Sequence, residues 1–323
     1  MIGSAKEIAK FILDNDDIAV ITHIRPDGDA YGTALCMTEA IRALGKRAFP
    51  ACSDPVEEKY AFLPDSGDFA SGDAMPFPPK AVLSVDVSDV KRMGDMENVF
   101  FACERRACLD HHATNPGFCD INFIDGKAAA AGEMALDVIK ELGVALSKDM
   151  AVNAYVAIST DTGNFSFSST TSNTYRYAAM CVDAGADVES LTRTLYRTRS
   201  IAKTRLLGYA LDRIELFENG RVAAIRLNDE VFEALGATRA DANSIVNYLN
   251  EIEGVRVGIL ADEMKEGVKF SFRAGVGADV SKIAKKFGGG GHIAAAGATA
   301  AGVTMEEIFP KVIKASCEAA REM

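Results

Sequence analysis

Residues 18–30 read IAVITHIRPDGDA, and this stretch decides the fold. Its apolar beginning predicts a strand over 18–23, and the residues that follow predict a helix over 29–44 that ends at Gly45. Gly28 frees the backbone in the turn between these two elements. The turn also carries three side chains that can bind metals: His23, Asp27 and Asp29. A strand, a short turn and a helix in this order are typical of a parallel sheet that binds ligands at the carboxyl ends of its strands.

The alternation of apolar strand and helix continues through the first half of the chain. Further strands are predicted over 47–52, 81–87 and 106–110, and further helices over 132–142 and 148–159. Strands that alternate with helices form parallel sheets covered by helices. We therefore expect an α/β domain whose parallel sheet has helices on both faces.

The pattern changes in the second half of the chain. After a helix over 173–184, a basic helix over 188–213 is interpreted as a connector. Beyond it we expect a smaller α/β C-terminal domain, with strands over 221–227, 255–261 and 267–273 and helices over 229–235, 240–250, 279–286 and 304–322. The predicted division is a metal-binding domain over 1–187, a helical connector over 188–213 and a substrate-binding domain over 214–323.

The composition is that of an ordinary globular protein. The chain has 323 residues, of which 48% are hydrophobic, enough for a sizeable core in two domains. Its apolar runs are far shorter than the roughly 20 residues of a membrane span, and its first residues lack the pattern of a secretory signal. The seven cysteines form no CxxC pair and are interpreted as reduced thiols. We expect a cytoplasmic protein that does not bind membranes.

The charge distribution limits the nucleic acids that the protein could bind. A net charge of −11 argues against general electrostatic binding of long duplex DNA. Basic residues nevertheless occur without acids between Ser190 and Leu211, and a second basic group comprises Arg273, Lys282, Lys285 and Lys286. Two interpretations stay open: a solvated helix face, or a local groove for a short phosphate backbone.

Acids and histidines also follow other apolar stretches. They are Asp86, Asp110, His111, His112 and Asp161. The carboxyl ends of parallel strands meet at one edge of a sheet, so these side chains are expected to converge with those of the first turn. Asp161, which follows a helical stretch, is placed there by convergence alone. Taken alone, Asp86 could simply lie in a turn at the end of a strand, and His23 could be a buried core histidine. All of these acids and histidines together favour a metal site.

The predicted site has both the ligand types and the charge of a two-metal centre. Imidazole and carboxylate together suit Mn²⁺, Zn²⁺ or Fe²⁺, and the excess of oxygen ligands favours Mn²⁺. Five crowded acids would repel one another unless cations neutralised them. Two divalent ions about 3.5–4 Å apart would do so and would promote phosphoryl transfer. We expect two Mn²⁺ ions, with Mg²⁺ or Co²⁺ as alternatives.

A second motif is the glycine run that His292 closes, FGGGGH. Its glycines are Gly288, Gly289, Gly290 and Gly291. Such a run can be no more than a flexible turn, or its backbone N–H groups can form a nest for a phosphate. In the second case His292 would donate to the phosphate and Arg273 could bind it with two hydrogen bonds.

Taken together, these motifs resemble those of a known family. HIRPDGDA, SVDVSD, DHH and DTGNF, in this order, resemble the four metal motifs of the DHH phosphoesterase superfamily. FGGGGHIAAAG resembles the glycine-histidine motif of the associated C-terminal substrate domain. The resemblance covers nearly the whole chain and implies an active site in the cleft between the two domains.

The resemblance implies a role for each motif residue, with Asp86 bridging two ions. The first ion would be bound by His23 and Asp27, and the second by Asp29, His111 and Asp161. His112 would face the substrate as a phosphate ligand or proton donor, and Asp110 would orient the neighbouring imidazoles. The terminal nucleotide or phosphate would be held by Arg273, Gly288, Gly289, Gly290, Gly291 and His292. Residues 128–131 are alanines where similar proteins often have Ser or Thr, so no hydroxyl role is transferred to them.

The resemblance also implies a substrate class. We expect hydrolysis of short oligonucleotides (nanoRNA) to 5′-mononucleotides and removal of the 3′-phosphate of 3′-phosphoadenosine 5′-phosphate. The nearest alternative is a phosphodiesterase for cyclic dinucleotides of the c-di-AMP type or for linear dinucleotides. An inorganic pyrophosphatase, a processive single-strand DNA exonuclease and a nucleotide sensor without catalysis are less consistent with the motifs. A homodimer remains open.

Overall fold

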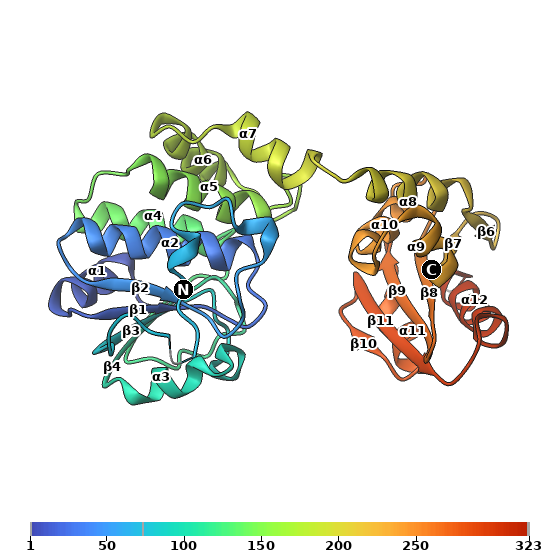
Figure 1. Ribbon diagram of the computed structural model, residues 1–323, viewed down its shortest axis with the longest axis horizontal. Helices are drawn as coiled ribbons and strands as arrows, with labels where there is room; N and C mark the ends of the chain where they lie inside the picture. Colours follow the sequence, from blue (N-terminus) through green and yellow to red (C-terminus); the bar gives the residue numbers. More distant parts are fainter. Residues whose placement is uncertain (1, 73, 322–323) are drawn as a thin grey trace. The chain divides into compact units, whose positions relative to one another are not determined.

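A computed structural model describes residues 2–72 and 74–321 of the protein (Figure 1). Internal contacts divide the chain into two compact units, with the division between Thr198 and Arg199. This division falls inside the segment predicted as a connector, 188–213.

The first unit is built on a sheet of five parallel strands in the order β2-β1-β3-β4-β5. The strands are β1 Ile18–Ile21, β2 Ala48–Ala51, β3 Ala81–Val85, β4 Arg105–Asp110 and β5 Ile121–Ile124. The prediction of a parallel α/β sheet is confirmed. The edge strand β5 was not predicted, because it has only four residues and two of them are half-exposed.

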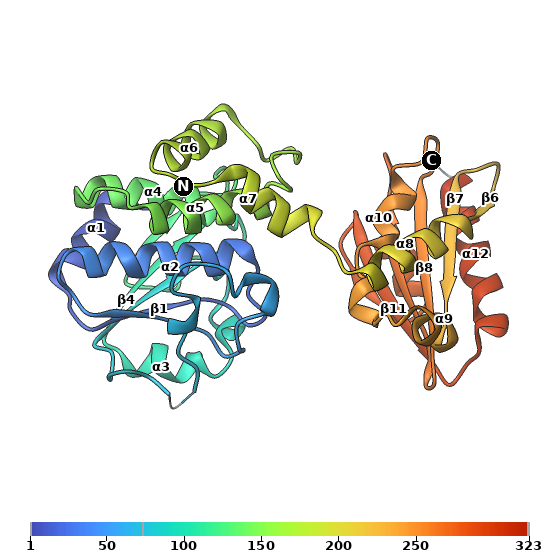
Figure 2. The ribbon, with the colours of Figure 1, turned by 45° about the horizontal axis from the view of Figure 1, so that its top comes forward.

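Helices cover both faces of this sheet, as predicted (Figures 1 and 2). Ile18 and Val20 point into the main core with the larger helices, whereas Ala19 and Ile21 pack in a smaller cluster with the short helix α3. This alternation follows from the two-residue period of a strand. The helices of the unit are α1 Ala5–Asp14, α2 Gly28–Ala43, α3 Met96–Ala102, α4 Ala131–Leu142, α5 Lys148–Asp161 and α6 Ser172–Asp183. The sequence did not predict α3.

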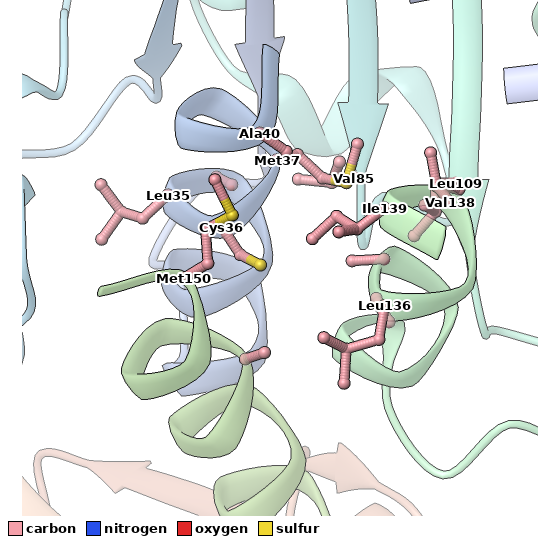
Figure 3. Close-up of a cluster of buried hydrophobic side chains, with 14 of the residues drawn as sticks. Leu35, Cys36, Met37, Ala40, Val85, Leu109, Leu136, Val138, Ile139 and Met150 are labelled. Carbon is pink, nitrogen blue, oxygen red and sulfur yellow. The ribbon is translucent and has the colours of Figure 1, made fainter. Parts of the chain in front are cut away.

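Helix α2 is almost fully buried at the centre of the unit. Leu35 and Met37 of α2 lie in the core with Met150 of α5 and Ile139 of α4 (Figure 3). Glycine allows α2 to approach α5 closely, because a Cβ at Gly32 would lie only 2.3 Å from a carbonyl oxygen of α5. This close contact helps to fix the N-terminal end of α2, which carries Asp27 and Asp29.

The predicted connector is not one continuous helix. Helix α7, Val188–Thr192, runs into a π-helical turn, η4 Arg193–Arg197, and the next helix α8 begins only at Ile201 and ends at Asp212. Ser200 starts α8 by accepting a hydrogen bond from the Lys203 N–H at 3.0 Å. The capping serine therefore overrides the helical pattern of the sequence.

The second unit is a six-stranded mixed sheet in the order β10-β11-β9-β8-β7-β6. Its strands are β6 Glu215–Phe217, β7 Val222–Leu227, β8 Val257–Met264, β9 Gly267–Ala274, β10 Gly290–Gly291 and β11 Ala295–Ala301. Helices pack on both faces, namely α8 with α9 Asp229–Leu235 and α10 Ile245–Asn250 on one, and α11 Val280–Lys286 with α12 Met305–Arg321 on the other.

Three strands of this unit were not predicted. β6 and β10 are only two or three residues long, and β11 consists of alanine, glycine and threonine, which carry a weak strand pattern. The helix predicted over 240–250 is interrupted: a short turn, η5 Arg239–Ala242, precedes α10.

The longest helix among the described residues is α12, and it is amphipathic. Met305, Ile308, Phe309 and Val312 form its buried face. Neither this helix nor any other in residues 2–72 and 74–321 has the length and apolar character needed to cross a bilayer.

The close approach of α2 to α5 gives a test of the fold. We expect Gly32→Ala to lower the free energy of unfolding, because overpacking a core costs about 1–3 kcal/mol and better helix propensity returns at most about 1 kcal/mol. Urea unfolding would measure the change. Gly67→Ala is the control, since a Cβ there would meet no other described atom within 4 Å. A Gly32→Ala midpoint equal to or above that of the unsubstituted protein would contradict the packing argument.

Candidate metal centre

The predicted ligands lie together in the first unit. Asp27 caps the N-terminal end of helix α2, and Asp29 lies in the first turn of this helix. The remaining side chains follow β1, β3 and β4 or end α5, and they are His23, Asp86, Asp110, His111, His112 and Asp161. Three groups of them have donor atoms within 4.8 Å of one another: His23 with Asp27 and Asp86, Asp29 with His111 and Asp161, and Asp86 with His111 and His112.

His111 lies at the centre of one group. Its Nε2 is 3.7 Å from Asp29 Oδ2, 3.5 Å from Asp86 Oδ1 and 3.6 Å from Asp161 Oδ2. Its Nδ1 is 3.3 Å from the carbonyl oxygen of Ala128, which can only accept a hydrogen bond. Nδ1 therefore carries a proton, and Nε2 is free to bind a cation with the three carboxylates.

His23 is oriented in the same way. Its Nδ1 donates to the carbonyl oxygen of Ile24 at 2.8 Å, and its Nε2 is 3.5 Å from Asp86 Oδ2. Asp86 is thus placed between the two imidazoles, with one oxygen toward His23 and the other toward His111.

The backbone at Asp86 is strained. This residue directly follows β3 and has a φ of 56°, in the left-handed region that non-glycine residues seldom adopt. Its Oδ1 is buried and, among the described residues, accepts no hydrogen bond. A buried carboxylate oxygen without a donor is costly unless a cation binds it. This orphaned oxygen and the surrounding imidazole and carboxylate groups fit a divalent metal ion.

Backbone N–H groups hold Asp29, and the sequence did not reveal them. Asp29 Oδ2 accepts from Ala131 N at 2.6 Å, and Oδ1 accepts from Gly132 N and from the Thr33 hydroxyl, each at 3.0 Å. The two N–H groups belong to the first turn of α4, where the helix dipole favours an anion. The alanines of this segment therefore act through their backbone, which no side-chain pattern could predict.

Asp110 orients one of the two imidazoles expected for it. Its Oδ1 is 2.8 Å from His112 Nδ1, and its Oδ2 accepts from Asn115 Nδ2 at 2.7 Å. Because both oxygens are occupied in this way, His111 is held by Ala128 rather than by Asp110. Asn115 also donates to the carbonyl oxygen of Val87 at 3.0 Å and was missed by the sequence analysis.

The substrate residues predicted from the glycine motif lie in the second unit. Arg273 is the next-to-last residue of β9 and donates to Asn247 Oδ1 at 2.9 Å and to the carbonyl oxygen of Phe272 at 3.0 Å. His292 is exposed, in the turn between β10 and β11. In the described part of the chain, none of these residues belongs to a group that could hold a metal ion.

The fold accounts for three of the four glycines. Gly288 has a φ of 75°, and a Cβ at Gly289 or Gly291 would lie 2.1 Å or 2.5 Å from the backbone of β11. Gly290 has no such reason, since a Cβ there would meet no other described atom within 4 Å. The run is therefore an ordered hairpin rather than only a flexible turn, and Gly290 is its one exposed position without a structural requirement for glycine.

Comparison with known proteins gives matches over both units. A model of the N-terminal domain of the DHH family matches residues 17–158, and a model of the DHHA1 domain matches residues 219–322. A Thermus thermophilus protein named bifunctional oligoribonuclease and PAP phosphatase NrnA is 32% identical over 92% of this chain and 88% of that protein. A Bacillus subtilis protein of the same name is 28% identical over 91% of this chain and 92% of that protein.

A solved structure supports the fold. An exopolyphosphatase-related protein from Bacteroides fragilis superposes with a TM-score of 0.87 at 24% sequence identity, over 98% of this chain and 97% of that chain. At this level of identity the likeness concerns the fold alone.

The cluster predicts proton release on metal binding. Burial lowers the pKa of His111, but the close approach of Asp86 at 3.5 Å and the nearby carboxylates outweigh it and raise that pKa to about 10. Burial raises the pKa of Asp161 to about 6. A cation displaces these protons, so Mn²⁺ binding at pH 7 should release about one proton from His111, and affinity should rise as pH rises from 6 toward 9.

Calorimetry in buffers of different ionisation enthalpy would measure this release. His292→Ala, in the second unit, should leave the number of released protons unchanged. A binding heat that is independent of the buffer, together with an affinity that does not change with pH, would contradict the protonated state of His111.

Proposed function

The chain belongs to the DHH family of phosphoesterases, and from this premise we propose that it hydrolyses very short oligonucleotides to 5′-mononucleotides and removes the 3′-phosphate of 3′-phosphoadenosine 5′-phosphate. The relatives from T. thermophilus and B. subtilis are named bifunctional oligoribonuclease and PAP phosphatase, and they match this chain over 92% and 91% of its length. The two family models match residues 17–158 and 219–322, which include the glycine motif and every proposed metal ligand except Asp161.

The two-metal assignment is carried by the position of Asp86. One of its oxygens is 3.5 Å from His23 Nε2 and the other is 3.5 Å from His111 Nε2, an arrangement suited to a carboxylate shared by two ions. Its proposed partners are His23 and Asp27 on one side and Asp29, His111 and Asp161 on the other. Two Mn²⁺ ions, or Mg²⁺ or Co²⁺ in their place, would activate water and stabilise charge on the phosphate oxygens.

His112 is proposed to act on the substrate. Its Nδ1–H is committed to Asp110, so its partly exposed Nε2 is the atom left for a phosphate oxygen or a leaving oxygen. The hydrogen bond to Asp110 raises the pKa of His112, although burial opposes it, and this favours the protonated form. A protonated His112 can neutralise a phosphate or give a proton to the departing group.

The second unit is proposed to bind the other end of the substrate. Arg273 keeps its side chain ordered through Asn247 and the carbonyl of Phe272, which leaves guanidinium N–H groups for an anion. His292 and the main chain of Gly290 and Gly291 are the further proposed contacts of the substrate. The N–H groups of Gly288 and Gly289 already donate to the carbonyl oxygens of Lys285 at 3.2 Å and Ala284 at 2.9 Å, so the proposed part of these two glycines is to shape the motif. Binding of both ends would limit the enzyme to short substrates.

Product analysis tests the proposed substrates. The Mn²⁺-loaded protein would be given a 5′-phosphorylated adenylyl dinucleotide, a 24-mer RNA, adenosine 3′,5′-bisphosphate and cyclic di-AMP in parallel. We expect fast conversion of the dinucleotide and the bisphosphate to AMP, and slow reaction of the other two. Preferred opening of cyclic di-AMP would replace the proposal by a cyclic-dinucleotide phosphodiesterase, and binding without hydrolysis would replace it by a sensor.

Asp86→Asn is the matched control for the product analysis. Asparagine tolerates the left-handed conformation of this position better than alanine does, so the fold should be kept. Activity should fall by at least about 100-fold on every substrate, as for removal of an essential charged group from a reaction centre. Full activity in this variant, with an unchanged circular dichroism melt, would remove the two-metal assignment.

Substitutions in the glycine motif test end binding. His292→Ala should raise KM for the dinucleotide about tenfold or more, because a hydrogen bond to a charged group contributes about 1.5–3 kcal/mol. The rate on bis(p-nitrophenyl) phosphate, which lacks the nucleotide, should change less than about twofold. Ile293→Ala is the control, because Ile293 is the apolar neighbour of His292 and is 64% exposed.

Gly290→Ala adds an independent probe of the same motif. The fold leaves room for this methyl group, so a raised KM would report on the approach of a phosphate to the backbone. Equal losses on the dinucleotide and on the generic diester would contradict separate binding of the substrate end.

A further inference from the structure

Arg92 lies beside the proposed metal centre, in a segment that the sequence analysis did not single out. It belongs to the short turn η3 Val90–Met93, and its guanidinium Nη2 is 3.2 Å from His23 Nδ1. The backbone fixes this position, because Ile24 N donates to the carbonyl oxygen of Arg92 at 2.6 Å. The adjacent Met93 is fully buried and its carbonyl oxygen accepts from Ser53 Oγ at 2.8 Å. The location of Arg92 therefore does not depend on its own side chain.

The contact between Arg92 and His23 does not satisfy the guanidinium. His23 Nδ1 is 2.8 Å from the carbonyl oxygen of Ile24, and a carbonyl can only accept. Nδ1 must therefore carry a proton, and a guanidinium N–H, which is also a donor, finds no acceptor there. Binding of a cation at His23 Nε2 leaves the same proton on Nδ1. The donors of Arg92 stay available in both states.

Arg92 has no acidic partner either. Within the described ranges, no carboxylate lies within ion-pair distance of its guanidinium, although Asp27 and Asp86 are in contact with the neighbouring His23. An arginine that served only to neutralise the acidic cluster would pair with one of these carboxylates. The exposed guanidinium instead offers N–H donors next to the group formed by His23, Asp27 and Asp86.

We propose that Arg92 binds a non-bridging oxygen of the substrate phosphate at the metal centre; the proposal rests on the phosphoesterase function proposed above for the same site. The planar guanidinium presents paired N–H groups that match two phosphate oxygens. The main chain of η3 holds Arg92 beside His23, and from there the guanidinium would reach a phosphate bound at the group formed by His23, Asp27 and Asp86. Charge that develops on the phosphate during hydrolysis would be stabilised by a donor already in place. Arg92 would thus bind the phosphate from the first unit, independently of Arg273 and His292.

Three variants separate this role from general charge effects. Arg92→Gln removes the charge, Arg92→Lys keeps it without the fork of donors, and Lys91→Gln is the matched control. Lys91 is the adjacent exposed cation, and its side chain forms no hydrogen bond or ion pair with the residues that the structure describes. The backbone bonds of the turn are present in all three variants, so each is expected to fold, which a circular dichroism melt would check.

Activity and two binding measurements are compared across these variants. For Arg92→Gln we expect kcat to fall roughly 100- to 1,000-fold on both the dinucleotide and bis(p-nitrophenyl) phosphate, as for loss of one oxyanion donor. Arg92→Lys should recover part of this loss, and Lys91→Gln should stay within about twofold of the unsubstituted protein. By calorimetry, Arg92→Gln should bind Mn²⁺ within about threefold of the original affinity but bind inorganic phosphate at least about tenfold more weakly when loaded with Mn²⁺.

Two results would overturn the proposal. One is a set of Arg92 variants that match Lys91→Gln in kcat and in phosphate affinity. The other is a large loss of Mn²⁺ affinity in Arg92→Gln with activity restored by excess Mn²⁺. This result would mean that Arg92 positions His23 and does not bind the phosphate. Failure of this proposal can be distinguished from failure of the proposed substrate assignment. A protein that hydrolyses only bis(p-nitrophenyl) phosphate would still allow kcat and phosphate affinity to be compared between the Arg92 variants and Lys91→Gln.

Discussion

Crowding of carboxylates at one edge of the first sheet is the constraint on which the site depends. Asp27, Asp29, Asp86, Asp110 and Asp161 are brought near one another by β1, β3, β4, α2 and α5. Three of them receive different forms of compensation from the chain. Asp29 accepts from the amides of α4, Asp110 from Asn115 and His112, and Asp86 lies between two imidazoles. Asp86 keeps one oxygen without a donor among the described residues, so compensation by protein groups is incomplete and the proposed cation would complete it.

Much of the first unit could be predicted because its sequence pattern and its chemistry agree. The apolar runs before His23, Asp86 and Asp110 form the strands β1, β3 and β4, and the side chains after them converge as parallel strands require. Strand β5 and helix α3 escaped prediction because they are short and partly exposed. The helix predicted over 188–213 was wrong in its continuity, because Ser200 caps a new helix.

The parts of the site that could not be predicted are those in which side-chain identity carries no information. Ala128 positions His111 through its carbonyl group, and Ala131 with Gly132 binds Asp29 through N–H groups. Any residue type could provide these contacts, so only the path of the backbone reveals them. The place of Arg92 beside His23 likewise depends on a hydrogen bond between the main chains of two separate turns.

The proposed ligands are spread along the chain from His23 to Asp161, and this links metal occupancy to folding. An unfolded chain holds these groups far apart, so it binds a cation much more weakly than the native unit does. A metal ion bound at the proposed site would therefore stabilise the native state in proportion to the logarithm of its free concentration. Because the contact of α4 with Asp29 joins positions 102 and 103 residues apart, the site can assemble only after most of the first unit has packed. Binding at the proposed site would therefore report on packing of the whole first unit, and melting temperatures of this protein would be comparable only at a fixed concentration of free metal.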